Sequence, residues 1–124
     1  MSLVLVVEDD APFRRLACAV LGRAGYRTCQ AADGEEALQV LAQRPVSLVL
    51  LDVDLPRVSG GGVLAGLAAS PLGREVPVIL MTALGDAEIA KHASDPRVRA
   101  VLMKTQFSLA DLRAQVRRAL PLAG

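Results

Sequence analysis

The chain has 124 residues and a formal net charge of +1, because 14 basic side chains stand against 13 acidic ones. Hydrophobic residues make up 52% of the sequence and aromatic residues only 2%, so one core of aliphatic side chains is expected. This composition excludes a disordered tail, a general electrostatic attraction to DNA or membranes, and an aromatic platform for single-stranded nucleic acid. The two cysteines, Cys18 and Cys29, match no metal-binding or CxxC redox spacing.

Five apolar runs have the length of β-strands. Three of them are nearly continuous stretches of Val, Leu and Ile, which is typical of strands buried on both faces of a parallel sheet. The second run is more polar and indicates an edge strand. In chain order, the predicted strands span residues 3–7, 26–30, 46–51, 76–81 and 100–103.

A helical pattern follows the first run. Pro12 suits its first turn and Gly25 suits the position just after its end. The apolar residues in between recur at intervals of three and four, which predicts a single buried stripe. This stripe consists of Phe13, Leu16, Ala17, Val20, Leu21 and Ala24.

Two further helices are indicated by capping-box spacing. Asp33 precedes Glu36 by three residues, as Ser108 precedes Asp111, and each pair stands before an apolar helical pattern that a proline ends. Asp10 is also expected to cap the first helix, because an acidic side chain just before a helix that starts with proline can accept hydrogen bonds from its free amides.

Strands and helices therefore alternate, with two weaker helical patterns at residues 61–69 and 86–93. Such alternation predicts an α/β fold with a parallel sheet and helices on both faces, in the flavodoxin-like order 2-1-3-4-5. We expect residues 1–124 to form one domain, which either stands alone or is part of a longer protein. In this topology, ligands bind beyond the carboxyl ends of the strands.

Chemically active side chains gather at those strand ends. Glu8 and Asp9 follow the first run, Asp52 ends the third, Thr82 follows the fourth, and Lys104 follows the fifth. Two carboxylates ~5 Å apart repel by roughly 3 kcal/mol at an effective dielectric of ~20, so a cation is expected among them. Oxygen ligands with room for phosphate suit Mg²⁺, and the lysine and hydroxyl suit a phosphoryl group. The pattern indicates phosphoryl transfer to a carboxylate.

Four motifs, in order and at matching spacing, resemble the receiver domain of bacterial two-component response regulators. The resemblance covers essentially the whole chain, and its strength lies in the combination because each motif alone is common. The motifs are Leu5-Val6-Val7-Glu8-Asp9-Asp10, Leu50-Leu51-Asp52-Val53-Asp54-Leu55-Pro56 with Gly60, Met81-Thr82-Ala83, and Leu102-Met103-Lys104.

The resemblance implies a role for the acidic residues. Asp52 is expected to be the phosphoacceptor. Mg²⁺ is expected to bind Asp9 directly, Glu8 nearby or through water, the side chain of Asp52, and the backbone carbonyl of Asp54. The side chain of Asp54 is then not required for the metal.

The resemblance also implies partners. Thr82 would hydrogen-bond the phosphoryl group and Lys104 would pair with it. A sensor histidine kinase or a histidine phosphotransfer domain is the expected donor, and an output domain or target protein the expected recipient of the signal. We expect a cytoplasmic signalling module that catalyses only its own phosphorylation and dephosphorylation, and that binds neither nucleic acid nor membrane directly.

Three departures from the family pattern bear on switching. Thr105 follows the lysine where the family usually has proline, Val101 stands where many members have a mobile aromatic ring, and Ser94-Asp95-Pro96 replaces the usual Gly-Ala before the last strand. A receiver that does not switch, and serves as a docking module or phosphate sink, is therefore one alternative.

Two alternatives of other classes follow from the residues. Asp52 and Asp54 form a DxD pattern similar to that of haloacid-dehalogenase-type phosphatases, although that family needs a further acidic pair near the end of the chain. A flavodoxin-like cofactor binder would need a phosphate loop and flanking aromatics, which the sequence lacks. His92 and the basic side of the last helix are interpreted as surface residues.

Overall fold

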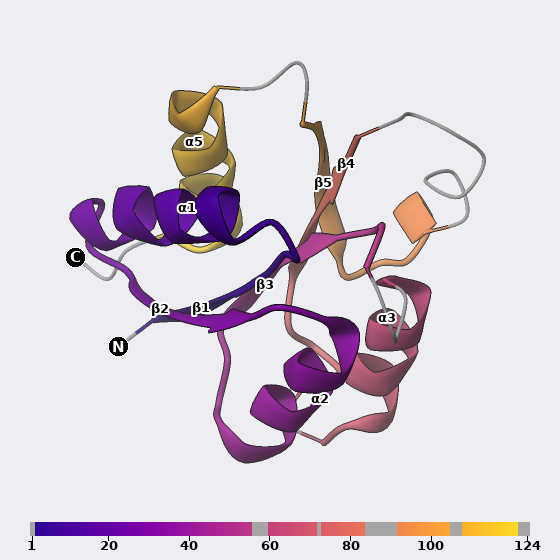
Figure 1. Ribbon diagram of the computed structural model, residues 1–124. Coiled ribbons are helices and arrows are strands. Elements are labelled where there is room, and N and C mark those ends of the chain that lie inside the picture. The colour runs from indigo at the N-terminus through magenta and orange to yellow at the C-terminus, as the bar shows by residue number, and fades with distance from the viewer. Residues whose placement is uncertain (1, 56–59, 72, 84–91, 105–107, 122–124) are drawn as a thin grey trace.

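The computed structural model describes residues 2–55, 60–71, 73–83, 92–104 and 108–121. All strands pair in parallel and form one sheet in the order β2-β1-β3-β4-β5 (Figure 1), which confirms the predicted fold class. The strands are β1 (Leu3–Val7), β2 (Arg27–Ala31), β3 (Leu48–Asp52), β4 (Val78–Thr82) and β5 (Val98–Met103). The helices are α1 (Ala11–Arg23), α2 (Gly34–Gln43), α3 (Gly60–Ala69) and α5 (Leu109–Ala119).

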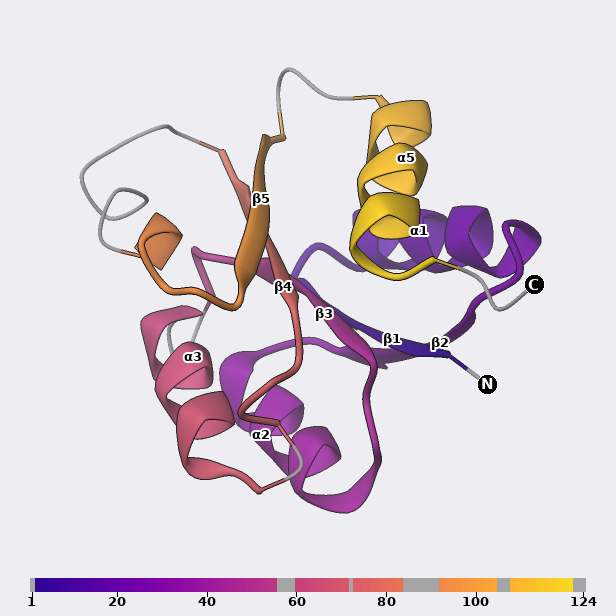
Figure 2. The same cartoon turned by 180° about the vertical axis from the view of Figure 1, so that it is seen from behind.

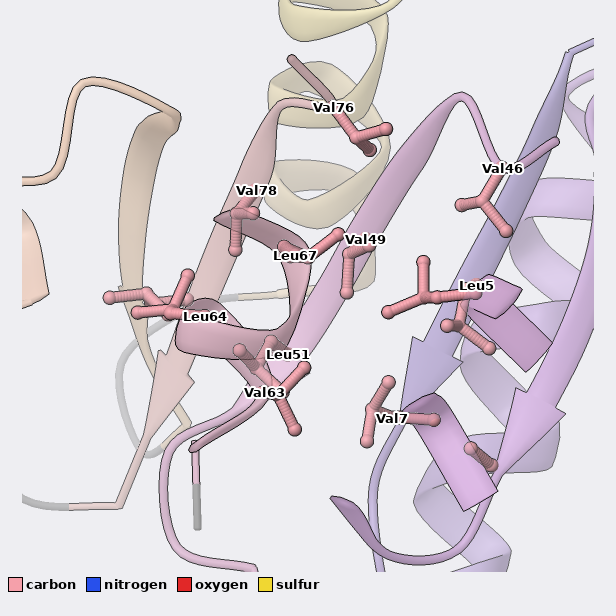
Figure 3. Packing of buried hydrophobic residues seen from close by; sticks show 14 of the residues in the cluster. Leu5, Val7, Val46, Val49, Leu51, Val63, Leu64, Leu67, Val76 and Val78 are labelled. Carbon is pink, nitrogen blue, oxygen red and sulfur yellow. The ribbon is translucent and has the colours of Figure 1, made fainter. Parts of the chain in front are cut away.

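Helices cover both faces of the sheet, as the two opposite views show (Figures 1 and 2). Helices α1 and α5 lie on one face, and α2 and α3 lie on the other. Successive side chains of a strand point to opposite faces, so each apolar strand contributes to two cores. Figure 3 shows the core between the sheet and α3, where Leu51 and Val49 of β3 lie beside Val63 and Leu67.

The predicted strands are correct in number and order, but β3 and β4 begin two residues later than expected and end one residue later. Val46 and Val76 extend the apolar runs because both are buried, yet neither belongs to a strand. An apolar run reports burial, whereas a strand is defined by its hydrogen bonds, and Pro77 has no amide to donate. The shift places Asp52 and Thr82 inside their strands as the last residues.

The predicted capping boxes are partly confirmed. The Asp33 side chain accepts a hydrogen bond from the Glu36 amide at 2.8 Å, and Ser108 with Asp111 forms a complete box. Asp10 occupies the N-cap position of α1, but its side chain makes no capping hydrogen bond, so its predicted role is wrong. A capping side chain accepts from the second or third amide of a helix, and the second residue of α1 is Pro12.

The predicted apolar stripe of α1 is wrong at one position. Leu16 is 49% exposed, and Cys18 is buried in the core instead. Gly25 follows the helix with a φ of 103°, which is the left-handed conformation expected of a glycine after a helix. The buried side of α1 is therefore rotated relative to the prediction.

The segment before β5 is tied to α3. The Arg97 guanidinium forms an ion pair with Asp95 at 2.6 Å and donates a hydrogen bond to the Leu64 carbonyl at 3.0 Å. This contact lowers the pKa of Asp95 through the hydrogen bonds from Arg97. The unusual Ser94-Asp95-Pro96 segment thus supplies an anchor for Arg97.

The C-terminal end of α5 is held against the start of β2. The buried Tyr26 hydroxyl donates a hydrogen bond of 2.6 Å to the Leu120 carbonyl. Of the helix predicted at 86–93, residues 86–91 lie outside the described ranges, and His92 and Ala93 are helical. Among the helices that the structure describes, none is long and apolar enough to cross a membrane.

Candidate functional site

Strand register brings the predicted site residues to one edge of the sheet. Val7 pairs with Leu51 across β1 and β3, which makes the following residues, Glu8 and Asp52, level with each other. Thr82 pairs with Met103 across β4 and β5, so Lys104 comes immediately after this pair. The carboxyl ends of β1, β3 and β5 therefore present their side chains at a common level, although Glu8 and Lys104 lie near opposite ends of the sequence.

Side-chain alternation selects the face on which these groups meet. Every second residue of a strand points to the same face, and the residues that lead to the three site residues pack in the core under α1 and α5. Glu8, Asp52 and Lys104 continue this phase and lie on the α1 and α5 side of the sheet. The leading residues are Val4 and Val6 in β1, Leu48 and Leu50 in β3, and Ala100 and Leu102 in β5.

Lys104 lies between the two buried carboxylates. Its Nζ donates a hydrogen bond to Asp52 Oδ2 at 2.9 Å and forms an ion pair with Glu8 Oε1. The other oxygen of each carboxylate accepts a backbone amide two residues further on. Asp54 N donates to Asp52 Oδ1 at 3.0 Å, and Asp10 N donates to Glu8 Oε2 at 3.2 Å. Each carboxylate is thus held on both sides.

Burial sets the electrostatics of the site. Glu8 is fully buried, and desolvation raises its pKa from 4.5 to about 7, with a further upward contribution from the hydrogen bond to Asp52. Burial lowers the pKa of Lys104, but the hydrogen bonds and negative charges of Glu8 and Asp52 outweigh it, and the pKa is raised overall. The site therefore holds a charged lysine beside a buried glutamate that ionises less readily than usual.

The acidic residues fit a divalent cation. Carboxylate oxygens of Glu8, Asp9 and Asp52 all lie within 4.8 Å of one another, with Glu8 and Asp52 buried and Asp9 exposed. Apart from the ion pair with Lys104, the buried Glu8 Oε1 accepts no hydrogen bond from any residue that the structure describes. Three oxygen donors, one of them open to solvent, are the donor set that Mg²⁺ takes while retaining water and phosphate oxygens.

Thr82 and Asp54 contact the other site residues through backbone groups. Thr82 is buried at the end of β4, and its carbonyl accepts a hydrogen bond of 2.7 Å from Lys104 N. The Asp54 side chain is exposed, and its amide supports Asp52. Val101 is half-buried and packs against the core on the α3 side. Thr105 lies outside the described residues.

Two residues of α1 at the site were not predicted from the sequence. Lys104 Nζ lies over the Phe13 ring, 5.5 Å from its centroid, and Arg14 Nη1 donates a hydrogen bond of 2.7 Å to the Glu8 carbonyl. Phe13 was assigned to the apolar stripe of the helix. The only sequence signal for either residue is its place in the first turn after the acidic motif, which does not reveal what it contacts.

The comparisons with known proteins agree with this geometry. The family model described as the response regulator receiver domain matches residues 4–117. The chain is 33% identical to the phosphate regulon transcriptional regulatory protein PhoB of Escherichia coli (strain K12), over 97% of this chain and 54% of that protein. It is 41% identical to the probable transcriptional regulator ycf27 of Cyanophora paradoxa, over 67% of this chain and 34% of that protein.

Solved structures share the whole fold. The chemotaxis protein CheY4 of Vibrio cholerae superposes with a TM-score of 0.87 at 25% identity, covering 97% of this chain and 99% of that one. The response regulator TrrA of Thermotoga maritima, solved in complex with Mg(2+)-BeF, gives a TM-score of 0.81 at 28% identity, covering 97% of this chain and 100% of that one.

These similarities favour the receiver domain over the two alternatives of other classes, and whether the chain switches stays a prediction. Neither the family match nor the relatives supports a haloacid-dehalogenase-type phosphatase or a flavodoxin-like cofactor binder. The match covers almost the whole chain, and the acidic edge lies where the four motifs place it. The chain belongs to the family of response regulator receiver domains.

Proposed function

We propose that Asp52 accepts a phosphoryl group in a Mg²⁺-dependent reaction and that the phosphorylated chain passes a signal to a partner. The observation that carries this proposal is the convergence of Glu8, Asp9 and Asp52 with Lys104 at one edge of the sheet. A structure selected for stability alone gains little from three neighbouring carboxylates, since each adds repulsion. Receiver domains bind Mg²⁺ in such an acidic pocket, and the Thermotoga relative was solved with it.

The chemistry follows from the side chains. A carboxylate oxygen of Asp52 attacks the phosphorus of a phosphohistidine, and the bond between that phosphorus and the histidine nitrogen breaks as the acyl phosphate forms. Glu8, Asp9, Asp52 and the carbonyl of Asp54 would hold Mg²⁺, which supplies positive charge to the phosphoryl oxygens. Lys104 would pair with the same oxygens.

Thr82 would complete the phosphoryl site. It is the last residue of β4 and lies beside the lysine, because its carbonyl accepts the Lys104 amide. In this proposal its hydroxyl donates a hydrogen bond to a phosphoryl oxygen, as the family pattern implies. A single hydroxyl and a single ammonium on one group of oxygens favour binding of one phosphoryl group in one orientation.

The proposed partners are those of a signalling module rather than of a classical enzyme. Receiver domains are phosphorylated by histidine kinases, and we propose a sensor histidine kinase or a histidine phosphotransfer domain as donor. The recipient is an output domain or a target protein. The chain spans 34% to 54% of the length of the curated relatives named above, and we propose that residues 1–124 form one receiver domain. The absence of direct contact with nucleic acid stays a prediction.

Phosphorylation of the purified chain by acetyl phosphate tests the proposal. In the presence of Mg²⁺, intact-mass spectrometry should find one added phosphoryl group, and EDTA should abolish it. Asp52→Asn should remove the addition, because the nucleophilic oxygen is replaced by an amide at nearly constant volume. Asp10→Asn is the matched control, since this exposed acid lies two residues from Glu8 but outside the cluster of acidic oxygens.

Three results would contradict the proposal. Equal labelling of Asp52→Asn and the unaltered chain would place the phosphoryl group elsewhere. Undiminished labelling in EDTA would remove the metal from the reaction. Repeated turnover of a phosphomonoester, without a stable adduct, would favour phosphatase chemistry instead.

A further inference from the structure

We propose that Phe13 is a positioning residue for the phosphoryl transfer. The face of its ring holds the Lys104 ammonium at the site when a divalent cation occupies the carboxylates. This inference rests on the proposed function and adds to it a residue that the acidic and basic motifs do not contain. The observation behind it is the position of Lys104 Nζ over the Phe13 ring, 5.5 Å from the centroid.

Within the part of the chain that the structure describes, the Lys104 ammonium contacts two carboxylates and one aromatic ring, and the carboxylates are also the proposed ligands of the cation. Its Nζ contacts Asp52 Oδ2 and Glu8 Oε1, and both carboxylates belong to the cluster of acidic oxygens. A divalent cation held by these carboxylates would compete for the same negative charge and would repel the ammonium. Lys104 would then be held less firmly at the step where it has to meet the phosphoryl oxygens.

The Phe13 ring is the one of these contacts for which a divalent cation would not compete. Hard divalent cations bind oxygen ligands, whereas an ammonium is attracted to the negative face of an aromatic ring within about 6 Å. Phe13 lies in the first turn of α1, half-buried against the core under this helix, so its ring is held in place independently of the carboxylates. It can keep Nζ near Asp52 without adding negative charge that would have to be neutralised.

The composition makes this contact unusual in the chain. Aromatic residues are 2% of the sequence, and only one Tyr and two Phe are present. An aliphatic side chain would serve the core equally well at this position, as it does in most of the buried stripe. Only an aromatic ring adds attraction for a cation, which separates a positioning role from simple packing.

Nuclear magnetic resonance of labelled lysine tests the contact without any phosphorylation. The chain has only two lysines, Lys91 and Lys104, so the ε-methylene region contains two signals and Lys104→Arg identifies one of them. In the unaltered chain the Lys104 signal should be shifted upfield by the ring current, and the shift should persist in saturating Mg²⁺. In Phe13→Leu the shift should disappear, and in Phe13→Trp it should return.

The rate of labelling by acetyl phosphate tests the consequence. At saturating Mg²⁺, Phe13→Leu should lower this rate by roughly two- to fivefold, which is the loss expected for one cation–π contact at a partly exposed site. Phenylalanine analogues with increasing fluorination, inserted at position 13 alone, should slow the reaction stepwise at constant shape. Leu16→Ala, an exposed apolar change on the same helix, should alter neither the rate nor the Lys104 signal.

The outcomes separate this inference from the proposed function. If the chain is never labelled, the proposed function fails, and the Lys104 signal still decides the contact. If Asp52 is labelled but the fluorinated series reacts at one constant rate, Phe13 is only a packing residue. An unshifted Lys104 signal in the unaltered chain would overturn the inference as well. The fluorinated series keeps the question open to test even if Phe13→Leu does not fold.

Discussion

At the scale of single residues, the two buried carboxylates share one arrangement. Each gives one oxygen to the backbone amide two residues further on and the other to Lys104. The amides of Asp10 and Asp54 orient the carboxylates before any ligand arrives, which reduces the entropy lost when a cation or phosphoryl group binds. Asp9 differs because it is exposed and reaches the same cluster from the solvent side.

Asp9 and Asp10 are expected to contribute very differently to the affinity for Mg²⁺. Asp9→Ala should weaken Mg²⁺ binding by about tenfold or more, because it removes one of the three clustered carboxylates. Asp10→Ala, one residue further on, should bind Mg²⁺ nearly as well as the unaltered chain, since only the Asp10 amide supports Glu8. Titration with Mg²⁺ followed by calorimetry measures both. Equal losses in the two variants would show that the acidic motif acts through its total charge.

At the scale of elements, α2 and α3 meet at a glycine. A Cβ at Gly66 would overlap Leu38 Cδ2, the end of a flexible side chain, so Leu38 would have to shift to admit a side chain there. Gly22 in α1 is the opposite case, because a Cβ at that position meets nothing within 4 Å. The two helical glycines thus differ in their surroundings, because a neighbouring side chain opposes a substitution at Gly66 and not at Gly22.

The two glycines form a matched pair for a stability measurement. Gly22→Ala should raise the free energy of unfolding by about 0.5–1 kcal/mol, because alanine favours the helix and restricts the unfolded chain. Gly66→Ala should lower it by about 1 kcal/mol, because overpacking against Leu38 outweighs the same gain. Urea unfolding of both variants is the measurement.

The cause can be isolated with Leu38→Ala. In that background the overlap is removed, and Gly66→Ala should become stabilising, as in a double-mutant cycle. If Gly66→Ala is already as favourable as Gly22→Ala in the unaltered chain, Leu38 moves aside at no cost. The close approach of α2 and α3 would then not depend on the glycine.

At the scale of the whole molecule, the site is part of the core rather than an addition to its surface. Glu8 is fully buried, so its ionisation is linked to the free energy of unfolding. The pKa of Glu8 is raised to about 7 in the folded chain, against an ordinary value of 4.5. The folded protein therefore binds a proton that the unfolded chain has already released between these two values.

The free energy of unfolding is therefore expected to fall as the pH rises. The stability that Glu8 contributes is fully present below about pH 4.5 and is lost as the pH rises through about 7. We expect the metal-free chain to lose up to about 3 kcal/mol between pH 5 and pH 8. Urea unfolding in EDTA at intervals of pH measures this, and Glu8→Gln should flatten the profile. A free energy of unfolding that rises over this range would contradict the prediction.

Asp95 affects the free energy of unfolding with the opposite sign and at lower pH. Its pKa lies below the ordinary value of 3.8 because of the hydrogen bonds from Arg97. The stability from this pair is present above that value and is lost only as the pH falls below it. The two effects are therefore separated along the pH axis, and the range from pH 5 to pH 8 reports on Glu8.

Much of the molecule was determined by the sequence alone. Continuous apolar runs identified parallel strands buried on both faces, and their alternation with helical patterns led to the observed strand order. The acidic and basic residues of the site could be predicted because each stands at or just after the end of a strand. The carboxyl ends of the strands in a parallel sheet meet at one edge. These features depend on local order along the chain, so the sequence contains them.

Only the tertiary structure decided how the groups contact one another. The orientation of α1 about its own axis exposes Leu16 and places Phe13 against Lys104. This orientation depends on how the helix packs on the sheet. The support of the Glu8 and Asp52 carboxylates by amides two residues on depends on backbone dihedral angles at the strand ends. Contacts between residues distant in the sequence arise from packing of the whole chain, and no local pattern of residue types specifies them.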